Sequence, residues 1–371
     1  MNETKVLQLK QNVSKVLFPI KQIDQSTNIS KNACPNSVRT DGGIQLQEYY
    51  LVFFLLVELL EYKNSGQGEK VAWAIPIDYK GKLYSIEYRK MGLGIFADEK
   101  EDLNAEEICK KINKAIKVAE PYFEFIAKQQ VNGSKLNVNN NCKILFDRYN
   151  YFVNIHTQMI SKIVDKHIFD NYLEKQQASW IALSAIDAFY SWTEHVFIHI
   201  GILQEKIKTG LDVVQFVEME WKDKFKKIIG FDNEEYKIIY DKLVEIKTQL
   251  RNFYAHGAFG KTGEAFSFHS KTGAVPVKLT SSIKNKKTYS LQGKKGFNEK
   301  DAIAIIDNFI DILWKNSRAP AKIYLMDSDL PVILSHANDG VYHDAMISEV
   351  NMTDFVGNLC RMFDDAANMY W

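Results

Sequence analysis

Hydrophobic residues follow two different periods along this chain, and the shorter one is clearest in residues 71–88. Apolar positions alternate with smaller or polar ones in residues 71–77, and a second apolar run at 83–88 follows the turn Tyr79-Lys80-Gly81-Lys82. A period of two on both sides of a glycine-containing turn predicts a β-hairpin. A third short strand is expected at residues 93–96.

The longer period, with apolar residues three and four positions apart, covers most of the remaining chain and predicts helices. We expect helices near residues 43–62, 104–130, 143–172, 178–207, 214–229, from 233 into the segment 251–256, at 298–315 and at 352–370. Alternation returns in two further places. It predicts a second hairpin from residues 265–269 and 274–277, and two short strands at 323–326 and 331–334.

Changes of period divide the sequence into three parts. An Asn-rich polar loop at residues 131–141 predicts the first boundary. Residues 1–140 then form an α+β region, for which a sensor or regulatory role is one interpretation. Residues 141–316 form a helical bundle with a β-hairpin at about 264–278, and residues 317–371 form a small C-terminal α/β cap. The expected fold class is therefore mainly α, with β-hairpin insertions.

Composition narrows the classes of protein to which this chain can belong. Hydrophobic residues make up 46% and charged residues 25% of the sequence, which is typical of a soluble globular protein. The formal net charge of +1 provides no overall basic field. Any binding of nucleic acid therefore has to depend on local patches of positive charge.

The cysteines and the longest apolar run argue against further classes of protein. The four cysteines are scattered, without a C-x-x-C pair, which argues against a zinc ribbon or a disulfide framework and fits the reducing cytosol. The start of the chain has no secretory signal. The apolar run from Tyr49 to Leu60 is too short to span a bilayer, which needs about 20 residues. We therefore expect a cytoplasmic protein with no membrane contact, no bound metal and no cofactor.

The segment Arg251-Asn252-Phe253-Tyr254-Ala255-His256, followed by Gly257, carries the most informative chemistry in the chain. Arginine binds phosphate through two parallel hydrogen bonds, and histidine transfers protons near neutral pH. RNA supplies its own nucleophile, the 2′-hydroxyl group. We therefore assign the proton transfers to His256 and charge stabilisation on the phosphate to Arg251. Asn252 would orient His256 or hold a phosphate oxygen.

Helical geometry predicts that one copy of this segment is not a complete site. The apolar residues before and within it recur at spacings of four and three, which predicts one stripe facing the bundle core. This stripe consists of Ile239, Leu243, Ile246, Leu250 and Phe253. Arg251 and His256 are about 140° apart on an ideal helix, too far for a compact site. Two antiparallel copies would bring each Arg251 to the His256 of the other copy, so we predict a homodimer with a composite site.

The pattern Arg-Asn-x-x-x-His at a helix end, followed by glycine, resembles the signature of the HEPN superfamily of helical RNA-processing and defence proteins. With the surrounding helices, the resemblance spans about residues 150–316. It implies a HEPN-like bundle and a dimeric, metal-independent endoribonuclease, acting as a bacterial defence or toxin effector that an antitoxin or other regulatory partner restrains. Some toxin members of the family have a Tyr two residues after the His. This chain has Ala258 there, so control by modification of such a Tyr is not supported.

Residues near the motif are assigned supporting roles. A rim of lysines is predicted to follow the RNA backbone, with a solvated loop as the alternative interpretation. These lysines are Lys261, Lys284, Lys286, Lys287, Lys294 and Lys295, with Lys271 close in sequence. Glu245 and Tyr254 are expected to support the site from the same helix.

Two alternatives from other classes stay open. One is a catalytically inactive HEPN-like module that binds RNA or a protein through the same bundle. The other is a metal-dependent hydrolase that uses His195 and His199, which lie one helical turn apart. The sequence offers these two histidines no third ligand, which favours two polar members of an aromatic-rich core helix.

Overall fold

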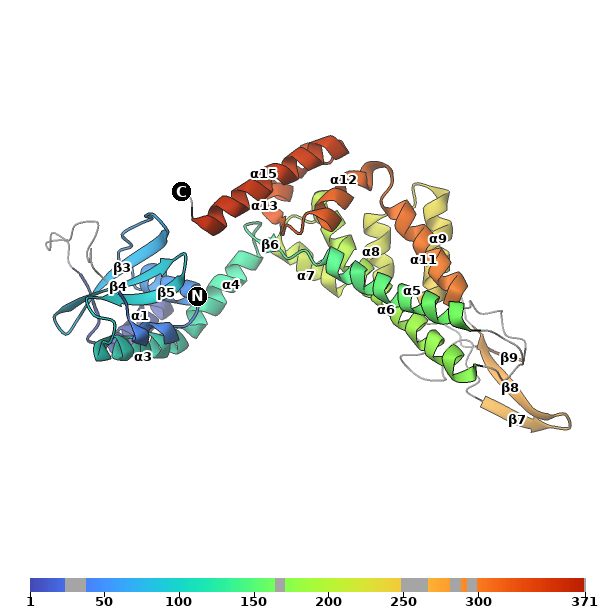
Figure 1. The fold of residues 1–371 in the computed structure, drawn as a ribbon, viewed down its shortest axis with the longest axis horizontal. Helices are drawn as coiled ribbons and strands as arrows, with labels where there is room; N and C mark the ends of the chain where they lie inside the picture. The colour runs from blue at the N-terminus through green and yellow to red at the C-terminus, as the bar shows by residue number, and fades with distance from the viewer. Residues whose placement is uncertain (24–37, 164–170, 248–265, 281–287, 292–298, 370–371) are drawn as a thin grey trace. The chain divides into compact units, whose positions relative to one another are not determined.

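The computed structural model describes residues 1–23, 38–163, 171–247, 266–280, 288–291 and 299–369. The chain divides into two compact units, one made of Met1–Asn132 with Asn358–Trp371 and the other of Gly133–Gly357. Helices make up most of both units, which confirms the expectation of a mainly α protein (Figure 1). In the described part of the chain, no helix combines the length and the apolar character needed to cross a membrane.

An antiparallel sheet forms the centre of the first unit, in the order β1-β3-β4-β5-β2. Its strands are β1 (Lys21–Gln22), β2 (Val38–Arg39), β3 (Val71–Tyr79), β4 (Lys82–Arg89) and β5 (Gly92–Ala97). Lys80 and Gly81 both have positive φ angles, of 55° and 81°, which close the tight turn between β3 and β4. The predicted hairpin and its third strand are therefore confirmed.

Helices supply the other half of this unit's core. They are α1 (Glu3–Leu17), η1 (Asp41–Gln45), α2 (Tyr49–Phe53), η2 (Phe54–Leu59), α3 (Leu103–Val118) and α4 (Glu120–Val131). Figure 1 shows α1 and α3 running beside each other. Val13, Leu55, Ile86 and Ile112 are fully buried in this core. The core thus forms between the inner face of the sheet and the helices.

Two sequence predictions for the first unit were wrong in detail, and one helix was missed. The predicted helix at 43–62 consists of a 3₁₀ turn, a short α-helix and a π-helix. The predicted helix at 104–130 is broken at Ala119, because Pro121 at the start of α4 has no N–H group to continue the helix. The amphipathic helix α1 was not predicted, since only Val13 and Leu17 are buried on its face.

A helical bundle forms the second unit, as the sequence predicts. Its helices are α5 (Cys142–Lys162), α6 (Tyr172–Leu203), α7 (Gly210–Glu218), α8 (Trp221–Ile228), α9 (Glu234–Ile246) and α11 (Glu299–Leu313). Figure 1 shows α5 and α6 side by side. Buried aromatic rings from α6, α8 and α11 contact one another in the core, including Phe197, Phe225 and Phe309. The single helix predicted at 214–229 is two helices, because Met219 and Glu220 adopt extended conformations between them.

The remaining elements of the second unit include two small sheets. β7 (Phe266–Ser270) and β8 (Gly273–Thr280) form the predicted hairpin, and β9 (Thr288–Ser290) extends it. After α11 come η4 (Asn316–Arg318), α12 (Ala319–Lys322), η5 (Ile323–Asp327), β10 (Val332–Ile333), α13 (Leu334–Asn338), α14 (Val341–Ala345) and α15 (Glu349–Asn368), of which the residues from Asn358 onward belong to the first unit. β10 pairs with β6 (Asn137–Val138), so the segment after the bundle is joined to the one before it.

The strand predicted at residues 323–326 was wrong. These residues form the π-helix η5, which continues directly from α12. Pro320 lies in the first turn of α12, and Tyr324 and Leu325 are buried on η5. A short apolar run fits a buried helix as well as a strand, so periodicity alone does not distinguish the two.

Candidate functional site

The predicted catalytic segment lies outside the described residues, and so do most of the predicted RNA contacts. This applies to Arg251, Asn252, Tyr254 and His256, and to Lys261, Lys284, Lys286, Lys287, Lys294 and Lys295. Glu245 is described and is half-buried on α9, while Lys271 is exposed in the turn between β7 and β8. The structure therefore places the helix that leads into the motif.

The helix α9 begins after an N-cap at Asn233, close to the start that the sequence predicts. The side chain of Asn233 accepts a hydrogen bond from the backbone N–H of Glu235, at 3.0 Å, which satisfies a donor at the helix start. Ile239, Leu243 and Ile246 are buried, with 3%, 0% and 0% of their surface exposed. The described part of the predicted apolar stripe therefore faces the core.

Contacts with α6 and α8 fix the last turn of α9. The hydroxyl group of Tyr190 donates a hydrogen bond of 2.6 Å to the carbonyl oxygen of Leu243. The Lys247 ammonium lies 5.5 Å from the Tyr190 ring centre and 5.4 Å from that of Trp221. It also lies 3.5 Å from a carboxylate oxygen of Glu194. The chain thus enters the undescribed segment from an anchored helix end.

Three side chains of types that bind metal ions lie close together in the second unit. Cys142 is the first residue of α5, and His195 and His199 lie one turn apart on α6. One candidate ligand atom from each of the three residues lies within 4.8 Å of the others. The two imidazole ring centres are 4.2 Å apart. The structure therefore brings a third potential ligand, from a distant part of the sequence, close to the pair of histidines.

Backbone groups just before α5 surround the two imidazoles. Nε2 of His195 accepts a hydrogen bond of 3.1 Å from the backbone N–H of Asn141. Nδ1 of His199 lies 3.0 Å from the carbonyl oxygen of His195, and its Nε2 lies 3.0 Å from the carbonyl oxygen of Asn139. Since Cys142 directly follows Asn141 in the chain, the segment 139–142 places both backbone groups and a thiol close to the two histidines.

Burial keeps all three side chains of this cluster uncharged. Burial, and then the charge of His199, lower the pKa of His195 to about 4. Burial also lowers the pKa of His199, against the opposing effect of its two backbone contacts. The pKa of the Cys142 thiol is raised by burial. Neutral imidazole is the form that binds metals, whereas the thiol has to lose its proton to do so.

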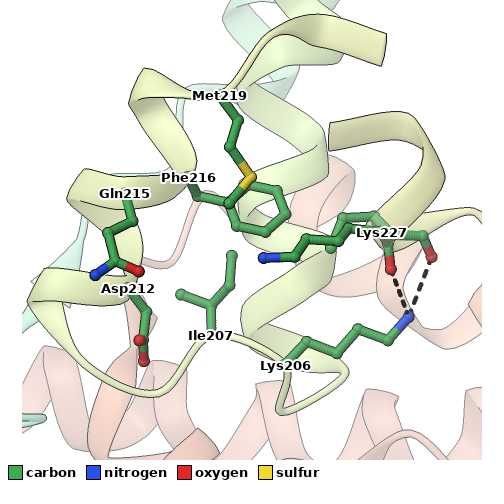
Figure 2. A pocket seen from close by; sticks show the side chains of 8 residues that line it. Lys206, Ile207, Asp212, Gln215, Phe216, Met219 and Lys227 are labelled. Atoms are coloured by element: carbon green, nitrogen blue, oxygen red, sulfur yellow. Dashed lines mark hydrogen bonds between the residues drawn. The ribbon is translucent and has the colours of Figure 1, made fainter. Parts of the chain in front are cut away.

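A small pocket beside α7 offers less chemistry. It has a volume of about 200 Å³, below the roughly 300 Å³ at which ligand pockets usually begin. Figure 2 shows that the ammonium group of Lys206 donates hydrogen bonds to the carbonyl oxygens of Lys227 and Ile228. The Asp212 carboxylate accepts from the backbone N–H groups of Lys208 and Thr209. Because these charges are engaged within the protein, the pocket does not define a functional site.

Comparisons with models of known protein families, with curated proteins and with solved structures found no match to this chain.

Proposed function

We propose that this protein is a metal-independent endoribonuclease with a catalytic site shared between two copies of the chain. The observation that carries the proposal is the position of Arg-Asn-x-x-x-His at residues 251–256, shortly after α9 ends at Ile246. Burial of Leu243 and the contacts of Lys247 anchor that helix end. A catalytic group needs a rigid element of this kind to hold it in place.

The chemistry follows from the three polar side chains. His256 takes the proton of the 2′-hydroxyl group, whose oxygen then attacks the adjacent phosphorus. Arg251 stabilises the negative charge that gathers on the phosphate, and Asn252 orients the imidazole or holds a phosphate oxygen. The protonated His256 then donates a proton to the departing 5′-oxygen, which restores the neutral imidazole. The products are a 2′,3′-cyclic phosphate and a 5′-hydroxyl group, so DNA is not a substrate.

Mixing two inactive variants tests whether the site is shared. In a dimer of one Arg251→Ala chain and one His256→Ala chain, one of the two composite sites keeps both wild-type residues. Co-expression of equal amounts should restore about a quarter of wild-type activity, because half of the dimers are mixed and each has one intact site. If both residues had to come from the same chain, the mixture would stay inactive.

The resemblance to HEPN proteins suggests a defence or toxin role, in which cleavage of cellular RNA halts growth. Expression of the wild-type chain should then inhibit growth, and His256→Ala should relieve the inhibition. His269→Ala is a matched control, since His269 is exposed on β7. Equal growth inhibition by all three proteins would contradict a catalytic role of His256. An antitoxin or other regulatory partner would restrain such an activity.

The two alternatives predict different results. An inactive RNA- or protein-binding module would form the dimer and bind without cleaving. A metal-dependent hydrolase built on His195 and His199 would lose activity in EDTA and tolerate Arg251→Ala. The hydrolase has weaker support, because Cys142 is fully buried and only 1% of the surface of His199 is exposed, so a polymeric substrate has little access.

A further inference from the structure

The side chains of Cys142, His195 and His199 lie close to the spacing of a metal site. Their candidate ligand atoms lie within 4.8 Å of one another. In tetrahedral zinc sites the Zn–S and Zn–N bonds of about 2.3 and 2.0–2.1 Å place ligand atoms roughly 3.3–3.6 Å apart. A contraction on the order of 1 Å would convert the cluster into that geometry.

We propose that Cys142, His195 and His199 bind one Zn²⁺ ion, which fastens residues 139–142 to α6. One thiolate and two imidazoles form a donor set that zinc prefers, and two histidines one turn apart on a helix present both rings on one face. On binding, the Cys142 thiol releases its proton to solvent and both imidazoles bind as neutral ligands. The fourth position falls to the carbonyl oxygen of Asn139 or to water.

The hydrogen-bonding pattern of His199 supports this site. Both ring nitrogens face carbonyl oxygens at 3.0 Å, those of His195 and Asn139. Neutral imidazole has a single N–H, so only one contact is a hydrogen bond and the other brings two lone pairs together. An ion bound to that second nitrogen removes the conflict. The remaining N–H keeps its carbonyl partner, which is the usual arrangement around a metal-bound histidine.

The position of Cys142 does not depend on an ion. The Asn140 side chain accepts a hydrogen bond from the backbone N–H of Cys142 at 3.1 Å and donates one to the carbonyl oxygen of Leu325 at 3.1 Å. These bonds hold the start of α5 in place. Binding of the ion therefore requires little ordering of the backbone, and the enclosed site fits a structural ion.

The test uses the full-length wild-type protein, with Zn²⁺ and Co²⁺ as probes. Metal analysis after dialysis against Zn²⁺ should give one ion per chain. The Co²⁺ complex should show a thiolate-to-metal charge-transfer band, which identifies a cysteine ligand in the folded wild type without any substitution. Zn²⁺ should also raise the melting temperature, since it binds only the folded state.

Two serine variants locate the ligand. Cys142→Ser should lose the charge-transfer band, the bound ion and the shift in melting temperature. Cys109→Ser, at another buried free cysteine, should keep all three. A wild-type protein that retains no Zn²⁺ would overturn the proposal, as would a Co²⁺ spectrum without the thiolate band or equal retention by Cys142→Ser. The first two results need no variant, so a variant that fails to fold leaves the test intact.

Discussion

The hydroxyl group of Tyr190 on α6 donates a 2.6 Å hydrogen bond to the carbonyl oxygen of Leu243 on α9. Tyr190 is fully buried, and the same carbonyl oxygen accepts the backbone N–H of Lys247. One side chain of α6 thus holds the last turns of α9, the described helix that precedes residues 251–256 in sequence. This contact connects the packing of the bundle with the proposed site.

Removal of that hydroxyl group should loosen α9 without leaving the carbonyl unsatisfied. Tyr190→Phe should lower the free energy of unfolding by about 1 kcal/mol, the usual net value of one hydrogen bond. Urea denaturation measures the change. Tyr151→Phe on the exposed side of α5 is the matched control and should have no measurable effect. Equal stability of Tyr190→Phe and wild type would show that the contact does not anchor α9.

The buried stripe of α9 should contribute far more to stability than its outer face. Leu243→Ala should cost about 2–5 kcal/mol, because it removes a fully buried side chain and leaves a cavity. Ile238→Ala, at a residue with 53% of its surface exposed on the same helix, should change stability by less than about 0.5 kcal/mol. Similar losses in the two variants, measured by urea denaturation, would contradict the packing of α9 described above.

In the first unit, Asp102 should make the free energy of unfolding depend on pH in the acid range. Its carboxylate caps α3 through the backbone N–H groups of Asn104 and Ala105, and it pairs with Lys82 at 2.8 Å. Burial alone would raise the pKa of Asp102, but the hydrogen bonds from Lys82, Ala105 and Tyr84 outweigh it and lower the pKa. The stabilising contribution is therefore complete above the unfolded pKa and is lost as the pH falls through the lower, folded value.

Two variants separate the cap from the charge of Asp102. Asp102→Ala should cost about 1 kcal/mol at pH 7, the usual value of a lost N-cap. Asp102→Asn keeps an N-capping oxygen and removes the titration. Its unfolding free energy should therefore depend less on pH in the acid range than that of wild type. The same acid dependence in wild type and Asp102→Asn would contradict the assignment.

The lysines after the motif should set the salt dependence of RNA binding. Replacing Lys284, Lys286 and Lys287 by Glu should weaken binding of single-stranded RNA. The slope of log K against log salt should also fall by about 0.7 for each phosphate that the protein no longer neutralises. Lys237→Glu and Lys242→Glu, on the exposed face of α9, are the matched controls. An unchanged slope in the triple variant would favour the solvated-loop interpretation.

Local sequence patterns predicted the elements whose contacts are local. Alternation and the turn at Lys80-Gly81 identified the first hairpin, and the spacing of Ile239, Leu243 and Ile246 identified the buried face of α9. The π-helix at Ile323–Asp327 was mistaken for a strand, because its apolar run is buried and short.

Elements that depend on distant contacts were not predictable in the same way. β6 is two residues long and pairs with β10 across a long stretch of sequence, so it has no pattern of its own, whereas β10 lies within the strand predicted at residues 331–334. Cys142 joins His195 and His199 only because α5 packs along α6, and no local motif records that contact. The Arg-Asn-x-x-x-His segment is the opposite case, since its chemistry is visible in sequence and its geometry lies outside the described residues.

The two proposals can fail separately. The ribonuclease proposal predicts activity in EDTA as long as the protein stays folded, so circular dichroism should accompany the activity assay and show whether removal of a structural Zn²⁺ ion lowers the helical signal. Loss of activity together with loss of helical signal would indicate that EDTA removed a structural ion from Cys142, His195 and His199. Loss of activity in a folded protein would instead contradict a metal-independent mechanism.

The most direct test of the central claim is end-group analysis of RNA cleaved in EDTA by wild type, Arg251→Ala and His256→Ala. Arg148→Ala and His269→Ala serve as matched controls, since both residues are exposed. We expect 2′,3′-cyclic phosphate and 5′-hydroxyl ends from wild type and both controls, and a loss of at least about 100-fold in rate for the two motif variants. Folded wild-type protein that leaves RNA intact, or cleavage that persists in His256→Ala, would contradict the proposed mechanism.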